Sequence, residues 1–434
     1  MLHITRRAAL FSLALMLAMP VLPAMAKDHA PKWIPTWYAS PEPSGVEAKI
    51  SDKTLRQIVR ISAGGTSVRL RLSNAYGAAP LKLEDIRVAK RVSGSHIDPA
   101  TDTAVTFNGR DTVTIAPGAY VLSDPLPMTV AADSDLAISL YVPEETPLVT
   151  VHDIQRGVLY IADGRASSAA ELPETKTDIG IGNAFPWLAE VEVSGSPAKA
   201  ALITFGDSIT DGYGITPDQG RTWPELLSRR LREAGIKLSV VNAGLSGNRL
   251  LHHGQWARLG DGGLSRFDRD VLAQPNASAV IVLIGINDLG HAQGPGSEGY
   301  VSAEDLIDGL SQTAARAHER GLKIYIATMT PFRDTVFEGY FSEDKETARQ
   351  AINAWIRKQT VFDGVIDFEK AVEDPARPGH LRPEYDVGDH LHPNDAGAAA
   401  MAAGFSNDRL ERPPDTGPAG YRTADHPGAN GRRQ

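Results

Sequence analysis

Apolar residues follow two different periods in this chain, and the change between them falls near residue 195. Between residues 33 and 193, short segments alternate apolar and polar positions, most clearly at 67–73, 112–115 and 135–142. Alternation with a period of two is typical of strands with one buried face, and the Gly and Pro residues between the segments indicate turns. The sequence therefore predicts a β-sandwich or jelly-roll-like accessory domain at residues 33–193.

From residue 200 onward, continuous apolar runs alternate with amphipathic segments. The runs predict strands at 200–205, 237–242, 279–284, 323–328 and 364–367. The amphipathic segments predict helices at 224–234, 303–320, 346–359 and 395–403. Buried strands that alternate with helices are typical of a parallel sheet covered on both faces. We therefore expect an α/β domain at residues 199–410, after a Ser-Gly-Ser-Pro link at 194–197.

The two ends of the chain differ in composition from the rest. Arg6 and Arg7 precede an apolar run, and Ala24-Met25-Ala26 matches a small-x-small cleavage site, so residues 1–26 predict a secretory signal peptide. The paired arginines also fit a twin-arginine signal. Residues 411–434 are rich in Pro, Gly and Arg, which predicts a disordered tail. We expect a periplasmic or secreted protein.

Composition narrows the function classes. Of the 434 residues, 42% are hydrophobic, enough for a sizeable core, and the formal net charge is −9 with no basic stripe, so nucleic acid is not an expected partner. The absence of cysteine excludes disulfides, thiolate metal sites and a cysteine nucleophile. Beyond the signal segment, no apolar run is long enough for stable membrane insertion. The sequence does not indicate an oligomeric state.

The most informative motif is Gly-Asp-Ser-Ile-Thr at 206–210, directly after the predicted strand at 200–205. Open α/β sheets bind ligands at the carboxyl ends of their strands. A serine there also has its N–H near a helix start, where a developing oxyanion is stabilised. A hydroxyl is a weak nucleophile and needs an adjacent base. Taken alone, the motif is a weak signal, because short Gly-Asp-Ser turns are common in loops and Ser208 could simply cap the next helix.

Three further blocks follow in order, Asn-Ala-Gly-Leu-Ser-Gly-Asn at 242–248, Gly-Ile-Asn-Asp at 285–288 and Asp-His-Leu-His-Pro at 389–393. Together with 206–210 they resemble the four sequence blocks of the SGNH (GDSL-type) esterase/lipase family, over roughly residues 200–405. The resemblance implies a flavodoxin-like doubly wound parallel sheet, the SGNH hydrolase fold. It also implies a carboxylic ester hydrolase that needs no metal or organic cofactor.

The resemblance assigns a catalytic triad. Ser208 would be the nucleophile, His392 the general base, and Asp389 the carboxylate that orients the imidazole. His390 competes for the role of base, but the family's D-x-x-H-P pattern fits Asp389 and His392. Their separation of three residues differs from the triads of G-x-S-x-G hydrolases, whose nucleophile motif is absent here.

The resemblance also assigns an oxyanion hole. Its donors would be the N–H of Ser208, the N–H of Gly244 and the side-chain amide of Asn287. Gly244 and Asn287 each follow a predicted strand, so they are expected at the same sheet edge as Ser208. Two ordinary interpretations stay open: Gly244 as a turn glycine, and Asn287 as a helix cap.

The substrate is less defined than the reaction. An exported acidic chain disfavours docking on anionic membranes, and the catalytic blocks have no long apolar lid segment. An accessory β domain can present a glycan-binding surface, by analogy of fold. We therefore expect short acyl, acetyl-type esters of carbohydrates or other polar alcohols, either small molecules or polysaccharides. The alternatives are a lipase or lysophospholipase, an acyltransferase, a metallophosphoesterase, and a non-catalytic glycan-binding protein.

Overall fold

The computed structural model describes residues 31–153, 156–173, 180–292, 294, 296–297 and 299–406. The predicted signal peptide at 1–26 and the predicted tail at 411–434 lie outside these residues. Within them, the longest helices are amphipathic, and none is long and apolar enough to cross a bilayer.

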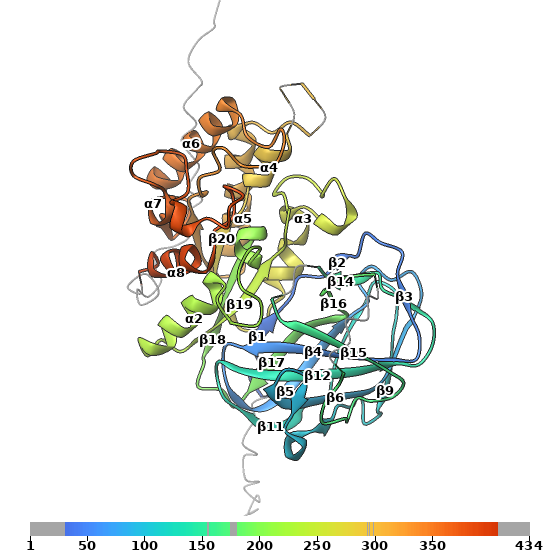
Figure 1. Cartoon of the computed structure of the whole chain (residues 1–434). Helices are drawn as coiled ribbons and strands as arrows, with labels where there is room; N and C mark the ends of the chain where they lie inside the picture. The colour runs from blue at the N-terminus through green and yellow to red at the C-terminus, as the bar shows by residue number, and fades with distance from the viewer. Residues whose placement is uncertain are drawn as a thin grey trace, which may run out of the picture. The chain divides into compact units, whose positions relative to one another are not determined.

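The first region is built from two antiparallel sheets (Figure 1). One sheet has the order β1-β17-β5-β10, with β11 also on β5; its strands are β1 (Ile34–Tyr38), β5 (Gly65–Ser73), β10 (Tyr120–Leu122), β11 (Leu126–Val130) and β17 (Leu188–Ser194). The other has the order β15-β4-β12-β6-β7, with β8 and β9 on β6; its strands are β4 (Lys53–Ile61), β6 (Leu81–Ser93), β7 (His96–Ile97), β8 (Thr103–Ala104), β9 (Thr112–Ile115), β12 (Ser134–Val142) and β15 (Val158–Asp163).

Both sheets contribute to one apolar core. Leu70 and Val191 come from the first sheet, and Val59 and Ile138 from the second. The alternating segments of the sequence therefore form the β-rich region as expected, whereas a jelly-roll topology stays a prediction. Five short strands complete the region: β2 (Glu42–Pro43), β3 (Lys49–Ile50), β13 (Thr146–Pro147), β14 (Thr150–His152) and β16 (Phe185–Pro186).

The second region contains the predicted parallel sheet. Its strands are β18 (Ala200–Gly206), β19 (Leu238–Gly244), β20 (Ala277–Leu283), β21 (Lys323–Ala327) and β22 (Gly364–Ile366). All neighbours pair in parallel, in the order β19-β18-β20-β21-β22. Numbered along the chain this is 2-1-3-4-5, the order of flavodoxin-like doubly wound sheets. The expectation of an α/β fold with a parallel sheet is confirmed.

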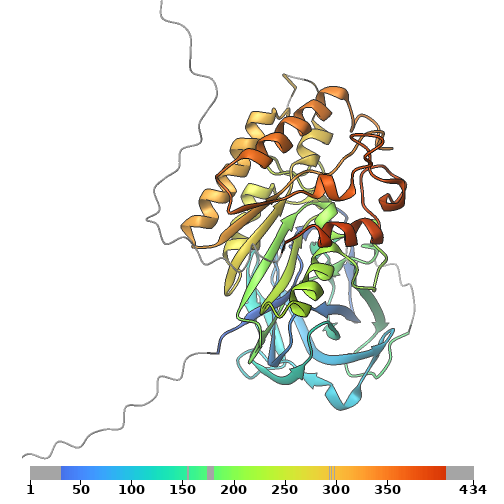
Figure 2. The same cartoon turned by 90° about the vertical axis from the view of Figure 1, so that its left-hand side faces the viewer.

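Helices cover both faces of this sheet (Figure 2). One group packs together as α2 (Trp223–Glu233), α7 (Phe368–Val372) and α8 (Asp395–Ala403). The other contains α3 (Gly263–Phe267), α4 (Ile286–His291), α5 (Ala303–Glu319) and α6 (Glu343–Lys358). The short helices α3, α4 and α7 were not predicted, because one to two turns are too few for a helical period to be recognised.

The two regions share buried surface. Strand β1 pairs with β17 of the first region and lies against β19 of the second. Tyr38 on β1 enters the core of the second region, where its hydroxyl donates to Asp270 Oδ1 at 2.7 Å. The described residues from Lys32 onward accordingly belong to one compact unit.

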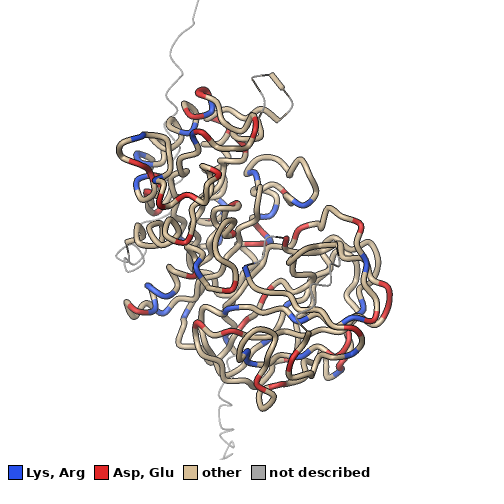
Figure 3. Tube along the Cα trace, viewed as in Figure 1, with Lys and Arg blue, Asp and Glu red and all other residues tan. Residues whose placement is uncertain are grey.

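Charged residues of both signs are intermixed along the described chain (Figure 3). Arg91 on β6 forms a bidentate ion pair with Asp218, which lies in the loop before α2, at 2.5 and 2.6 Å. This pair is a second polar link between the β-rich and the α/β regions.

Candidate active site

The nucleophile candidate stands where β18 ends and a short helix begins. Ser208 is the first residue of α1 (Ser208–Asp211), and the Asp207 side chain caps the helix by accepting the Ile209 N–H at 3.1 Å. At Gly206 the backbones come so close that an added Cβ would lie 2.5 Å from the Leu283 carbonyl oxygen. The turn therefore needs glycine at this position, and it presents the serine at the carboxyl edge of the sheet.

Ser208, His392 and Asp389 form a continuous hydrogen-bonded chain. The distance from Ser208 Oγ to His392 Nε2 is 2.8 Å, and from His392 Nδ1 to Asp389 Oδ2 it is 2.6 Å. The other Asp389 oxygen accepts the backbone N–H groups of Leu391 and His392. Burial opposes the charge, but the hydrogen bond from His392 and these backbone N–H donors lower the pKa of Asp389. The carboxylate is therefore held ionised against the imidazole.

Two aromatic rings keep the imidazole in place. Tyr213 lies 4.3 Å from the His392 ring and Phe337 lies 6.1 Å from it, between ring centroids. His390, the competing histidine, instead pairs with Asp386 at 2.5 Å and is half exposed. The geometry therefore brings His392, and not His390, to the serine.

The Asn287 side chain also reaches this edge, at the start of α4. Its amide nitrogen donates to the Asn248 carbonyl at 3.1 Å, and its amide oxygen accepts the Tyr340 hydroxyl at 2.9 Å. These partners fix which end of the amide is which and leave one N–H of Asn287 for a ligand. The Ser208 N–H, at the first position of a helix, has no acceptor among the described residues.

The structure gives the N–H of Gly244, the expected oxyanion donor, a different partner. This N–H donates to Asn242 Oδ1 at 2.8 Å, and Gly244 does not line the cavity that contains Ser208. Gly247, three residues later in the same block, does line it. The backbone N–H of Gly247 has no acceptor among the described residues. Gly247 adopts φ +74°, a conformation that favours glycine, so it replaces Gly244 as the candidate donor.

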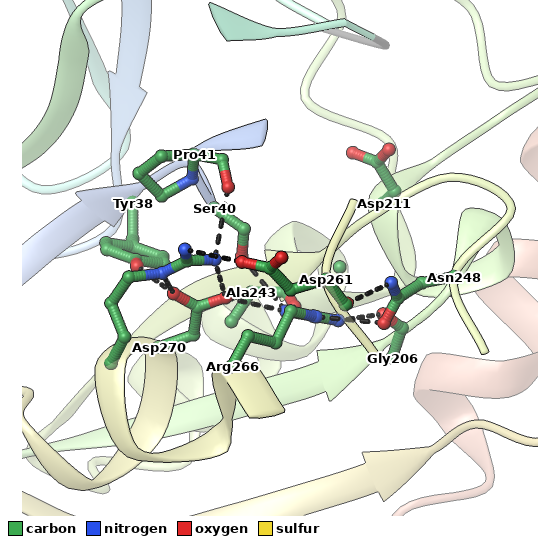
Figure 4. Close-up of polar contacts among 12 residues, drawn as sticks. Tyr38, Ser40, Pro41, Gly206, Asp211, Ala243, Asn248, Asp261, Arg266 and Asp270 are labelled. Carbon is green, nitrogen blue, oxygen red and sulfur yellow. Dashed lines mark hydrogen bonds and ion pairs between the residues drawn. The ribbon is translucent and has the colours of Figure 1, made fainter. Parts of the chain in front are cut away.

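A buried arginine that sequence reasoning missed ties these loops together (Figure 4). The Arg266 guanidinium donates to the carbonyls of Gly206 and Ala243 at 2.7 and 2.9 Å, and to Asn248 Oδ1 at 2.9 Å. Its charge is balanced by Asp270 at 2.9 Å. The cluster therefore joins the ends of β18 and β19 through one buried guanidinium. Removing one partner of such a buried ion pair costs about 3–5 kcal/mol.

Two further buried carboxyls support the loops. Burial, reinforced by the neighbouring Asp288, raises the pKa of Asp207 to about 7. Burial likewise raises the pKa of Asp288 to about 6, while its oxygens accept the backbone N–H groups of Leu250 and Leu251. Both carboxyls therefore hold backbone, consistent with a bracing role.

The serine opens into a cavity of about 600 Å³. Its lining combines the Ser208 site with residues from several other segments: Asp153, Ser208, Tyr213, Ser246, Gly247, Gln255, Trp256, Arg258, Leu259, Asn287, Gly290, His291, Ala292, Phe337, Glu338, Gly339, Tyr340, Leu391 and His392. A volume of this size accommodates a small organic ligand. The loop after β21 contributes the aromatic residues Phe337 and Tyr340 to the cavity, while Phe332 is buried in the core.

A serine hydroxyl held by a histidine that a carboxylate orients is the arrangement of serine hydrolases. Comparison with known proteins supports the same reaction class. Residues 204–400 match the model of the GDSL-like lipase/acylhydrolase family. Esterase TesA of Pseudomonas aeruginosa is 31% identical over 139 residues, which is 32% of this chain and 59% of TesA. The similarity to the GDSL-like lipase/acylhydrolase family therefore lies in residues 204–400, which include Ser208, Asn287, Asp389 and His392.

Solved structures similar to this chain include an acetyl xylan esterase, AlAXEase, at 22% identity over 47% of this chain and 96% of that one, with a TM-score of 0.36. A lipase/acylhydrolase from Enterococcus faecalis matches at 22% identity over 47% of this chain and 92% of its own, with a TM-score of 0.37.

Proposed function

We propose that this protein is an exported serine ester hydrolase that acts on short acyl esters of carbohydrates or other polar alcohols. The observation that carries the proposal is the hydrogen-bonded chain Ser208–His392–Asp389 at the wall of a ligand-sized cavity. The family of residues 204–400 supports the same reaction class.

The geometry suits a two-step acyl transfer. Ser208 Oγ attacks the ester carbonyl carbon while His392 Nε2 takes the hydroxyl proton, which gives a tetrahedral intermediate. Collapse of the intermediate breaks the bond to the alcohol, and His392 returns the proton to the leaving oxygen. Water, deprotonated by His392, then attacks the acyl-serine and releases the acid. Asp389 stabilises the imidazolium in both steps.

Three donors are available for the oxyanion of each intermediate. We assign the Ser208 N–H, the Gly247 N–H and the free N–H of Asn287, all of which belong to residues that line the cavity. Such donors are worth most when they are already oriented before the reaction. The contacts of Asn287 with Asn248 and Tyr340 supply this orientation.

Asn287→Ala is expected to lower kcat on p-nitrophenyl acetate about 10²-fold or more, with a much smaller change in KM, because the amide acts mainly on the developing oxyanion. Tyr340→Phe serves as the matched comparison: it keeps the ring but removes the hydroxyl that orients Asn287, so a smaller loss of kcat is expected. An effect of Asn287→Ala on KM alone would instead make Asn287 a substrate-binding residue.

The residues at the cavity rim favour a substrate whose alcohol part is a sugar-like ring with hydroxyl groups. Trp256 is 56% exposed at the rim, and Arg258, which stacks on it, pairs with Asp153 at 3.7 Å. An exposed aromatic face next to charged hydrogen-bonding groups suits a sugar ring, which has apolar faces and hydroxyl edges. Small-molecule sites are typically lined by apolar and aromatic side chains together with a few polar groups.

The expected substrate order is acetyl and butyryl above octanoyl and palmitoyl p-nitrophenyl esters, measured as kcat/KM, with acetate released from acetylated xylan. Trp256→Ala is expected to raise KM for acetylated xylo-oligosaccharides several-fold while leaving p-nitrophenyl acetate nearly unchanged. Tyr120→Ala is the control, since Tyr120 is an exposed aromatic on β10 outside the cavity. A preference for long acyl chains or phospholipid vesicles would indicate a lipase or lysophospholipase, and ester formation with added alcohols an acyltransferase.

Export is part of the proposal, because the charged and apolar segments of residues 1–26 have the composition of a signal peptide. N-terminal sequencing of the protein from periplasmic and culture fractions tests it. Cleavage after Ala26 is the expected result, and an uncleaved cytoplasmic protein would contradict it.

A further inference from the structure

A buried histidine of the β-rich region contacts the helix that begins with Ser208. His152 is the last residue of β14 and only 4% exposed. Its Nδ1 lies 2.9 Å from the Ser40 carbonyl oxygen, and its Nε2 lies 3.0 Å from Asp211 Oδ1. Both partners are acceptors, so both ring nitrogens carry hydrogen and the ring is an imidazolium.

The electrostatics of the pair agree with this geometry. Burial opposes charge on the ring, but the charge and hydrogen bond of Asp211 raise the pKa of His152 to about 9. Glu42, a second carboxyl that interacts with the ring, accepts the Asp153 N–H at 2.6 Å. Burial raises the pKa of Glu42 to about 8. Glu42 is therefore largely protonated at neutral pH and attracts the His152 imidazolium only weakly. Asp211 is therefore the ionic partner of His152.

Asp211 connects the histidine to the oxyanion loop. Its Oδ2 accepts both the backbone N–H of Ser246 at 3.0 Å and the Ser246 hydroxyl at 2.6 Å. Among the described residues, Ser246 has no other hydrogen-bond partner. The next residue, Gly247, carries the candidate oxyanion N–H. The position of that N–H thus depends on Asp211, and the position of the Asp211 carboxylate depends on His152.

We propose that His152 is a positioning residue for ester hydrolysis, through which the β-rich region sets the oxyanion loop Ser246-Gly247 by way of Asp211. The inference rests on the proposed function. It gives the β-rich region a part in the active site, beyond any role as a separate binding module. A displacement of about 1 Å in a catalytic group can cost 10²-fold in rate, so a contact outside the reacting atoms has leverage here.

The test compares His152→Ala, His152→Gln, Ser246→Ala and the His152→Ala/Ser246→Ala double variant on p-nitrophenyl acetate. His152→Ala is expected to lower kcat about 10- to 100-fold with KM within about twofold. His152→Gln should recover part of this loss, because its amide N–H can still donate to Asp211. The double variant should be little worse than His152→Ala, since residues that act through one partner are not additive.

Arg91→Gln is the control. It breaks another contact between the same two regions, the partly buried ion pair with Asp218, which does not touch the oxyanion loop. Its kcat should stay near the wild-type value even where its melting temperature falls as much as that of His152→Ala. Equal kcat losses in Arg91→Gln and His152→Ala, or fully additive losses in the double variant, would overturn the positioning role.

Hydrogen exchange separates this inference from the proposed function. Amides of residues 244–249 are expected to exchange faster in His152→Ala than in the wild type, and unchanged in Arg91→Gln. A wild-type protein that hydrolyses no ester would refute the proposed function, and unchanged exchange in His152→Ala would refute the inference whatever the activity.

Discussion

Ser208→Ala is expected to lower kcat for ester hydrolysis by about 10³-fold or more while the protein stays folded. The hydroxyl is the proposed attacking atom, and members of a triad act as a unit, so losing it removes the covalent route altogether. Stability should change little, because the only hydrogen-bond partner of Ser208 Oγ among the described residues is the His392 ring. The measurements are kcat on p-nitrophenyl acetate, the melting temperature, and covalent labelling by a fluorophosphonate.

A matched serine variant controls for the substitution itself. Ser302→Ala removes the N-cap hydroxyl of α5, away from the cavity, and should cost about 1 kcal/mol of stability with kcat unchanged. Fluorophosphonate should label the wild type and Ser302→Ala but not Ser208→Ala. Labelling that persists in Ser208→Ala would identify another nucleophile. Activity that persists in Ser208→Ala without labelling would favour the metal-dependent alternative, and a wild type that hydrolyses no ester would favour the non-catalytic one.

His392→Ala is expected to be nearly as damaging as Ser208→Ala, with kcat reduced about 10³-fold, because the serine loses its proton acceptor. His390→Ala is the matched control two residues away, and only a small change is expected, since the His390 ring pairs with Asp386. Asp389→Asn should fall between the two, because the backbone still holds part of the loop around the imidazole.

The measurement is kcat of all three variants under the same conditions, and circular dichroism checks that each variant is folded. Comparable losses in His390→Ala and His392→Ala would contradict the assignment of the base. Full activity of His392→Ala would remove the imidazole from the mechanism.

The amino-acid sequence predicted the architecture of the second region because its signal is local. Apolar runs and amphipathic segments set the strands and longer helices, and parallel pairing then brings the ends of β18, β19 and β20 to one edge. Motifs placed directly after those strands must meet there, so Ser208 and Asn287, which the family resemblance singles out, were expected at that edge. The short helices α3, α4 and α7 carry too few residues for such a signal.

The oxyanion loop shows where this reasoning fails. Gly244 and Gly247 belong to one block at the carboxyl end of β19, so spacing does not distinguish them. Whether a backbone N–H faces the cavity or a neighbouring side chain depends on the loop's path. Here the Asn242 side chain accepts the Gly244 N–H, and Asp211 holds Ser246, which leaves Gly247 to line the cavity that contains Ser208.

By itself the sequence determined the change from a β-rich to an α/β region, the parallel sheet, and the residues that stand at its carboxyl edge, because period and order along the chain encode these. Only the tertiary structure decided which side chains support that edge. Arg266 and His152 stand in no motif, and each contacts residues more than 50 positions away. Their importance comes from burial beside charged and polar partners, and long-range packing of that kind leaves no local pattern.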